Sequence, residues 1–140
     1  MRPSIHDDIG LVPAIEWLAN RLSTNSNINC KIEVSGIEHR LEPDDELNLF
    51  RIVQEAFNNI RRHSEAVNVY INIAFDNNSV QISLRDDGKG FSYGNQTSGL
   101  AAKGKLGLIG MQQRAEFMKG TLNIETRPGS GTVISLSKSY

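Results

Sequence analysis

Apolar residues recur along this chain with two periods, and each period predicts a different kind of element. Spacings of three to four residues predict amphipathic helices, over residues of about 11–23, 43–63 and 108–118. Strict alternation predicts strands, over residues 30–35, 66–75 and 79–85, and then a hairpin around the stretch ETRPGSGT. The expected order is α, β, α, β, β, a long loop, α, β, β.

Residues near the helix ends support these boundaries. Pro13 falls in the first turn of the first helix, where a proline is tolerated because the first N–H groups have no partner. Pro43 opens the second helix with two aspartates, and Arg61 and Arg62 close it, which complements the helix dipole. Trp17 has apolar neighbours, and we expect its indole in the core.

Two connections indicate the fold class. Asp76, Asn77 and Asn78 predict a tight turn, so the strands on either side of them form a hairpin. Residues 86–107 are rich in Gly, Ser, Asn and Lys, and a loop of this length is usually a lid, a binding loop or disordered. We expect an α+β fold, a two-layer α/β sandwich in which three helices cover one face of a mixed sheet.

Composition and charge narrow the function classes. The chain has 140 residues, 39 % of them hydrophobic, as expected of one soluble domain. A net charge of −1 offers no basic field for nucleic acid or an anionic membrane. Cys30 is the sole cysteine, which excludes an internal disulfide and a thiolate metal cage. Because no apolar run approaches the length of a membrane span, we expect a cytoplasmic fragment without direct membrane contact. Whether a full-length parent protein is anchored in a membrane stays open.

The second helix carries the first candidate site. Glu55, Asn59 and His63 stand at i, i+4 and i+8, so they share nearly one helical face. Such a row can hold a hydrated Mg²⁺ and the phosphates that it bridges, because Mg²⁺ prefers oxygen ligands and keeps several waters. Taken alone, the pattern also fits the solvated polar face of an amphipathic helix.

Two glycine-containing stretches supply the other candidates. RDDGKGF follows a strand, where Asp86 offers an acceptor for an exocyclic amine and Gly88 and Gly90 leave room for a flat ring. GKLGLIGM runs from a glycine-rich loop into a helix, and helix N-termini bind phosphate through free N–H groups. Taken alone, the first stretch also fits a plain turn, and the second a helix cap beside a flexible linker.

Together, in this order, the stretches resemble the catalytic ATP-binding domain of sensor histidine kinases. LFRIVQEAFNNIRRHS is similar to the N box of the nitrate-sensing and thermosensing subclass, RDDGKGF to the G1 box, and GLIGMQQRAEFMKG to the G2 box. PGSGTVISL resembles the closing strand, and RPSIHDDIGLVPAIEWLA the stretch after the dimerisation helices. The resemblance implies the Bergerat fold of gyrase, Hsp90 and MutL, with residues 1–10 as a linker and residues 11–140 as the ATP-binding domain.

The resemblance also implies roles for individual residues. Asn59 would coordinate Mg²⁺, Glu55 would reach it through water, and both would act in catalysis with His63. Asp86 would accept the adenine amine, supported by Thr132. The residues implied to bind ATP are Asn59, Arg62, His63, Asp86, Gly88, Gly90, Lys105, Gly107, Leu108, Gly110 and Thr132.

The implied chemistry is phosphoryl transfer. The domain would position the γ-phosphoryl group, neutralise its charge with Mg²⁺ and basic side chains, and close a lid against water. Lys105 stands where family members often have glycine, and Lys103 or Lys105 would reach the γ-phosphate. The implied acceptor is a histidine on a separate dimerisation domain, from which a response regulator takes the phosphoryl group. Without that domain, the fragment should be monomeric or weakly associated.

His6, in the stretch IHDDIG, could imitate the acceptor because acidic residues follow the phosphorylated histidine in this subclass. Only five residues precede it, however, and Pro3 and Pro13 would disrupt a helix through it. A metal role lacks a second histidine or cysteine at ligand spacing. We expect a solvated residue at a helix start.

Two other functions stay open. A protein-serine kinase or ATPase of the anti-sigma type belongs to the same superfamily, and the linker-like N-terminus argues against it. A docking module with a decayed nucleotide site is the alternative from a different class. Intact Asn59, Asp86, Gly88 and Gly90 argue against such decay.

Overall fold

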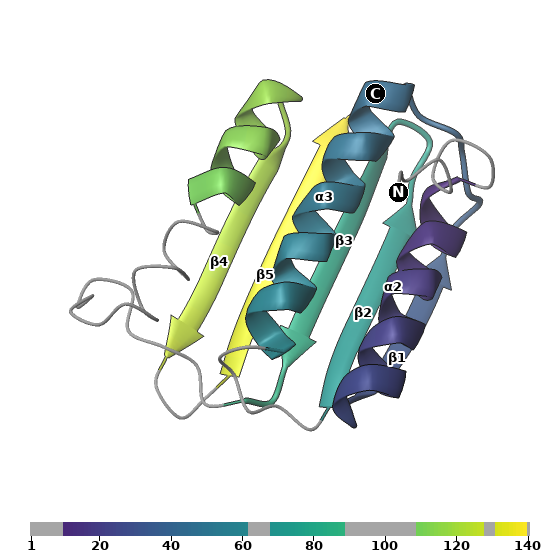
Figure 1. Cartoon of the computed structure of the whole chain (residues 1–140). Coiled ribbons are helices and arrows are strands. Elements are labelled where there is room, and N and C mark those ends of the chain that lie inside the picture. Colours follow the sequence, from purple (N-terminus) through teal and green to yellow (C-terminus); the bar gives the residue numbers. More distant parts are fainter. Residues whose placement is uncertain (1–9, 62–67, 89–108, 128–130, 140) are drawn as a thin grey trace.

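The chain folds into two layers, a mixed sheet and a layer of helices (Figure 1). The computed structural model describes residues 10–61, 68–88, 109–127 and 131–139. Its elements are α2 (Leu11–Ser26), β1 (Asn29–Ser35), α3 (Pro43–Asn59), β2 (Asn68–Phe75), β3 (Ser79–Asp86), a helix over residues 109–117, β4 (Thr121–Arg127) and β5 (Gly131–Ser139). The three helices of the described part lie on one face of the five-stranded sheet, so the expected α+β sandwich is confirmed.

The strand order determines which chain segments meet. Across the sheet the strands follow the order β1-β2-β3-β5-β4. β1 and β2 are parallel, whereas all other neighbours are antiparallel. The last residue of β3, Asp86, therefore pairs with Thr132 near the start of β5 and with Val69 near the start of β2. α3 ends at this same end of the sheet, which we call the site end; the opposite end is the far end (Figure 1).

One apolar core fills the space between the helices and the sheet. Alternate residues of β2 and β3, such as Val69, Ile71 and Leu84, point into it and are at most 2 % exposed. Phe50 of α3 and Met111 of the helix over residues 109–117 complete the core from the helical layer. No helix among the described residues has the length and apolar content needed to cross a bilayer.

α2 continues to Ser26, beyond its predicted end at Ser23. It ends at Asn27, whose φ of 56° is left-handed, a conformation that asparagine tolerates better than most residues. The hydroxyl of Ser23 donates to the carbonyl of Ile28 at 2.7 Å and fastens the chain as it leaves the helix. The polar residues 23–27 therefore belong to α2 and its C-terminal cap.

The expectation that Trp17 lies in the core is wrong. Its side chain is 41 % exposed, and the Arg21 guanidinium carbon lies 5.0 Å from the ring centroid. Ile15 and Leu18 face the core, and a helix turns about 200° between positions 15 and 17. The indole therefore lies along the outer surface, where it is covered in part by the cation one turn away.

The first turn of α3 is anchored to the preceding loop. Pro43 stands in this turn, as predicted. Glu46 is 1 % exposed, and its carboxylate accepts two hydrogen bonds from the Arg40 guanidinium at 3.0 and 3.1 Å and one from the Leu41 N–H at 3.0 Å. Burial of this carboxylate is tolerated because it is both paired and hydrogen-bonded. α3 is thus fixed at the far end.

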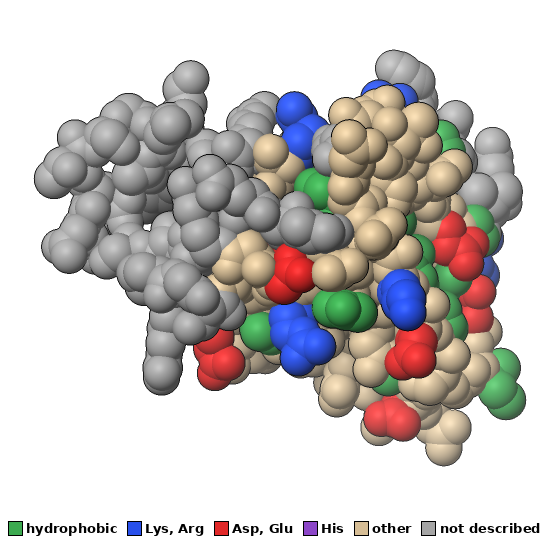
Figure 2. Space-filling view, turned by 90° about the horizontal axis from the view of Figure 1, so that it is seen from below, with side chains coloured by type: hydrophobic (Ala, Val, Ile, Leu, Met, Phe, Trp, Pro, Cys, Tyr) green, Lys and Arg blue, Asp and Glu red, His purple; other side chains and the backbone are tan. Residues whose placement is uncertain are grey.

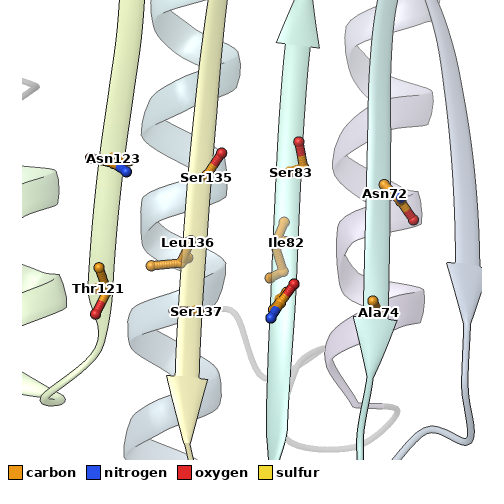
Figure 3. A pocket seen from close by; sticks show the side chains of 10 residues that line it. Asn72, Ala74, Ile82, Ser83, Thr121, Asn123, Ser135, Leu136 and Ser137 are labelled. Atoms are coloured by element: carbon orange, nitrogen blue, oxygen red, sulfur yellow. The ribbon is translucent and has the colours of Figure 1, made fainter.

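The sheet face away from the helices carries small polar side chains (Figure 3). Asn72, Ser83, Ser135 and Asn123 are neighbours by strand register and lie side by side across four strands. With adjacent residues they line a shallow hollow of about 280 Å³. These hydroxyl and carboxamide groups are suited to contact with water, as on the solvated face of an antiparallel sheet.

Candidate functional site

The site end brings together several of the residues expected to bind nucleotide, and Figure 2 views this end from below. Its described surface intersperses acidic, basic and uncharged side chains. The structure describes these expected residues: Glu55, Asn59, Asp86, Gly88, Gly110 and Thr132. The remaining expected residues lie outside the described part of the chain: Arg62, His63, Gly90, Lys103 or Lys105, Gly107 and Leu108. His6, for which we expected only solvation, also lies outside it.

Asp86, the last residue of β3, is a buried carboxylate with 4 % exposure. Its Oδ1 accepts the backbone N–H of Gly88 at 2.8 Å, and the backbone N–H of Thr132 also donates to the carboxylate. Burial raises the pKa of Asp86 and the nearby charge of Asp87 adds to the rise, while the two backbone hydrogen bonds oppose it. Asp86 is therefore an acceptor fixed in place by neutral donors.

Gly131 lets β5 approach the backbone of Asp86. Its φ is +80°, and a Cβ built there would lie only 2.3 Å from the Asp86 carbonyl oxygen. A residue with a side chain would be strained by this φ and would also clash with the backbone. The close approach places Thr132, which is 7 % exposed, beside Asp86. The sequence indicated the strand but not this steric requirement.

Asp87 ties the turn after β3 to the start of β2. Its N–H donates to the Asn68 carbonyl at 3.2 Å. Its Oδ1 accepts the Asn68 N–H at 2.9 Å, and its Oδ2 accepts the Asn68 side-chain amide at 2.8 Å. Sequence reasoning missed Asn68 because the two residues are 19 positions apart, and only the strand register brings them together.

α3 brings Glu55 and Asn59 to the site end, one turn apart and both half-buried. The Ile60 N–H is shared between the carbonyls of Ala56 and Phe57, a bifurcated hydrogen bond that is common at helix ends. Residues 60 and 61 then continue as a π-helical turn. Such turns are frequent at functional sites. The described residues contain no group of three or more His, Cys, Asp or Glu that could hold a metal. Glu55 and Asn59 are nevertheless oxygen donors of the type that Mg²⁺ prefers.

Gly110 lies in the first turn of the helix over residues 109–117, which runs toward the far end, so that this first turn is the part of the helix nearest the site end (Figure 1). A Cβ built there meets no atom within 4 Å, so this position faces open space. The helix itself is held by Met111 and Ala115 in the core and by Arg114, which donates to Asn48 of α3 at 3.4 Å. Its N-terminal turn is thus fixed relative to α3.

Comparisons with known proteins agree with this arrangement. Residues 44–139 match the family model described as "Histidine kinase-, DNA gyrase B-, and HSP90-like ATPase". The chain is 34 % identical over 131 residues to the signal transduction histidine-protein kinase/phosphatase DegS of Brevibacillus brevis, covering 94 % of this chain and 33 % of that protein. It is 30 % identical over 136 residues to the oxygen sensor histidine kinase NreB of Staphylococcus carnosus, covering 97 % and 38 %. The chain thus spans about a third of the length of these relatives.

Solved structures show the same fold at low sequence identity. The Acinetobacter baumannii histidine kinase AdeS superimposes with a TM-score of 0.69 at 14 % identity, over 92 % of this chain and 62 % of that one. The histidine kinase domain of the Erythrobacter litoralis EL346 blue-light activated kinase gives a TM-score of 0.63 at 15 % identity, over 89 % and 64 %. With the family match over most of its length, the chain therefore belongs to the family of histidine kinase-, DNA gyrase B- and HSP90-like ATPases.

Proposed function

We propose that this chain binds ATP with Mg²⁺ and donates the γ-phosphoryl group to a histidine on a separate dimerisation domain, for relay to a response regulator. The observation that carries the proposal is the buried carboxylate of Asp86, held by the N–H groups of Gly88 and Thr132 where α3 also ends. The family match and the relatives named as sensor histidine kinases support it.

Asp86 has the properties needed to select adenine. A carboxylate held by backbone donors keeps lone pairs that can accept the exocyclic amine of the base. Because Asp86 is buried, a base that presents a carbonyl at that position would leave the carboxylate facing another acceptor, which disfavours binding. Gly88 is buried beside it and adds no side chain that would obstruct a flat ring.

Glu55 and Asn59 have the chemistry to hold the metal. Carboxylate and carboxamide oxygens are ligands of the type that Mg²⁺ prefers, so the donor set fits, with Asn59 as a direct ligand and Glu55 acting through water. A bound Mg²⁺ would neutralise phosphate charge during transfer. α3 fixes these two side chains relative to Asp86, and so the helix would orient the phosphates relative to the base.

The proposal extends to residues outside the described part of the chain. Arg62 and His63 follow Asn59 by three and four positions, and their cationic or hydrogen-bonding groups would contact the phosphates. Lys105, or its neighbour Lys103, would approach the γ-phosphate from the lid. Gly90, together with Gly88, would open the pocket for the base. Gly107, together with the described Gly110, would shape the phosphate side of the lid, and Leu108 would also bind ATP.

The remaining parts of the proposal concern the whole protein. Residues 1–10 would link the ATP-binding domain, residues 11–140, to the dimerisation domain. The chain by itself would be monomeric or weakly associated, would act in the cytoplasm, and would contact neither nucleic acid nor membrane. A stable dimer in sedimentation would overturn the statement on association.

Calorimetric titration with ATP, with and without Mg²⁺, tests the binding site. We expect Asp86→Ala to abolish measurable binding and Asn59→Ala to remove the dependence on Mg²⁺. Absence of binding to the wild-type chain would favour a docking module, and binding indifferent to both substitutions would refute the site. Phosphotransfer from ATP to an added histidine-bearing dimerisation domain tests the reaction, since transfer to a serine of a partner protein instead would indicate a kinase of the anti-sigma type.

A further inference from the structure

We propose that Asn68 and Asp87 form a clasp that positions the turn from Asp86 to Gly88, and thereby sets both the affinity for ATP and the preference for adenine. The inference rests on the proposed ATP site, because the clasp acts through Asp86. Neither clasp residue is among those implied by the family resemblance. We treat both as positioning residues, since they would not touch the nucleotide themselves.

The contact between the two residues is reciprocal. Asp87 uses its backbone N–H and both carboxylate oxygens, and Asn68 uses its carbonyl, its backbone N–H and its side-chain amide. The two side-chain contacts, at 2.8 and 2.9 Å, involve a charged acceptor, which makes them stronger than neutral hydrogen bonds. Because main chain and side chain take part on both sides, the clasp fixes the orientation of Asp87 as well as its position.

The place of Asp87 in the chain gives this contact its consequence. Asp87 stands between Asp86 and Gly88, the two residues joined by the 2.8 Å hydrogen bond that holds the carboxylate. A rotation of the backbone at Asp87 would turn the Gly88 N–H away from Asp86. The clasp opposes that rotation, so it maintains the direction in which the carboxylate presents its free lone pairs.

The clasp also joins the start of β2 to the turn that follows β3. Asn68 is the first residue of β2, and residues 62–67 connect it to Arg61 at the end of the helix that carries Asn59. On the other side of the clasp, Asp87 follows the strand that carries Asp86. The first residue of β2 is therefore fastened to the turn that carries the proposed base-binding carboxylate.

Exchanging the two side chains tests the clasp. Asn68→Asp places two carboxylates face to face and removes the amide donor, so we expect ATP affinity to fall about tenfold. Adding Asp87→Asn restores a complementary pair, because the new amide at position 87 can donate to the new carboxylate at position 68. We expect the double variant to recover most of the lost affinity, as a coupled pair should. Asn77→Asp, the same change in the exposed turn at the far end of the hairpin, is the matched control and should bind as the wild type does.

Base selectivity distinguishes positioning from a general loss of stability. Calorimetry with ATP and GTP, alongside thermal unfolding, should show the ATP-to-GTP preference reduced in Asn68→Asp and restored in the double variant, at temperatures where all variants are folded. If Asn68→Asp does not fold, Asn68→Ala replaces it, with an expected loss of about threefold because only one hydrogen bond is removed.

Two results would overturn the clasp while leaving the ATP site intact. One is wild-type affinity and selectivity in the single variant, and the other is a double variant no better than the single one. Failure of the wild-type chain to bind ATP, or binding unaffected by Asp86→Ala, would overturn the proposed function and the clasp with it.

Discussion

Gly131→Ala tests whether the close approach of β5 to β3 builds the site. The added Cβ would lie 2.3 Å from the Asp86 carbonyl oxygen, whereas Cβ atoms essentially never come closer than 3.0 Å to such an atom, so the backbones must separate by about 0.7 Å. The φ of +80° costs a residue with a side chain about 1–2 kcal/mol of folding stability. When the displacement of the strand pair is included, we expect Gly131→Ala to lower the free energy of unfolding by about 2–3 kcal/mol.

Thermal unfolding measures this cost. For a domain of this size, the loss corresponds to a fall in Tm of roughly 10 °C. Gly110→Ala is the control for the gain of a methyl group, because a Cβ there meets no atom within 4 Å and alanine is favoured over glycine in a helix. Its Tm should equal or slightly exceed that of the wild-type chain.

The same variant tests the link between packing and binding. Because the Asp86 carbonyl precedes the turn to Gly88, its displacement should lower ATP affinity about tenfold, measured by calorimetry well below the reduced Tm. A Tm within about 2 °C of the wild-type value would refute the steric argument. A destabilised Gly131→Ala chain with wild-type ATP affinity would show instead that the strand contact supports the fold without placing Asp86.

Three further predictions concern single side chains. The pKa of Asp86 is raised in the folded chain, so its ionisation costs stability as pH rises through that pKa. In denaturant titrations, Asp86→Asn should therefore be at least as stable as the wild type at pH 7, and the difference should vanish near pH 3. A variant much less stable than the wild type at pH 7 would contradict this. Glu46→Ala should cost about 2 kcal/mol, because it leaves the Leu41 N–H without its acceptor, and Glu46→Gln should cost less; equal losses in urea unfolding would count against the hydrogen-bond argument. Met111→Ala should lower the free energy of unfolding by about 2–4 kcal/mol, because Met111 is buried in the core. Phe117→Ser should change it by no more than about 0.5 kcal/mol, because the Phe117 side chain is 78 % exposed. Similar losses for both variants would mean that Phe117 is covered in solution.

The sequence predicted the elements well because its periodicities are regular. The strand predicted over residues 79–85 is β3, which is one residue longer and ends at Asp86. α3 begins at Pro43, as predicted. The errors lie where tertiary geometry decides. Trp17 stands between the apolar residues Ile15 and Leu18, which suggested that it is buried. The helix nevertheless directs its side chain to the outer surface, because positions 15 and 17 lie on different faces of the helix.

The candidate site was predictable only in part. Motif order made Asp86 and Asn59 candidates, because each motif is continuous in the chain; their roles stay predictions. The contacts around Asp86 depend on the register between strands: Gly131 lies against Asp86, and Asn68 against Asp87. No local pattern encodes that register, and two consecutive aspartates look equivalent until the strand shows that one is buried and the other exposed.

The direction of the strands has a mechanical consequence. α2 begins and β5 ends at the far end of the sheet, and β5 lies between β3 and β4 (Figure 1). A pulling force applied between Leu11 and Ser139 would act mainly across the strands, so the ladders of β5 would open one pair at a time from Ser139. Force would reach the pairing of Asp86 with Thr132 last. Tension transmitted through these two attachment points would therefore loosen the far end before it disturbed the site end.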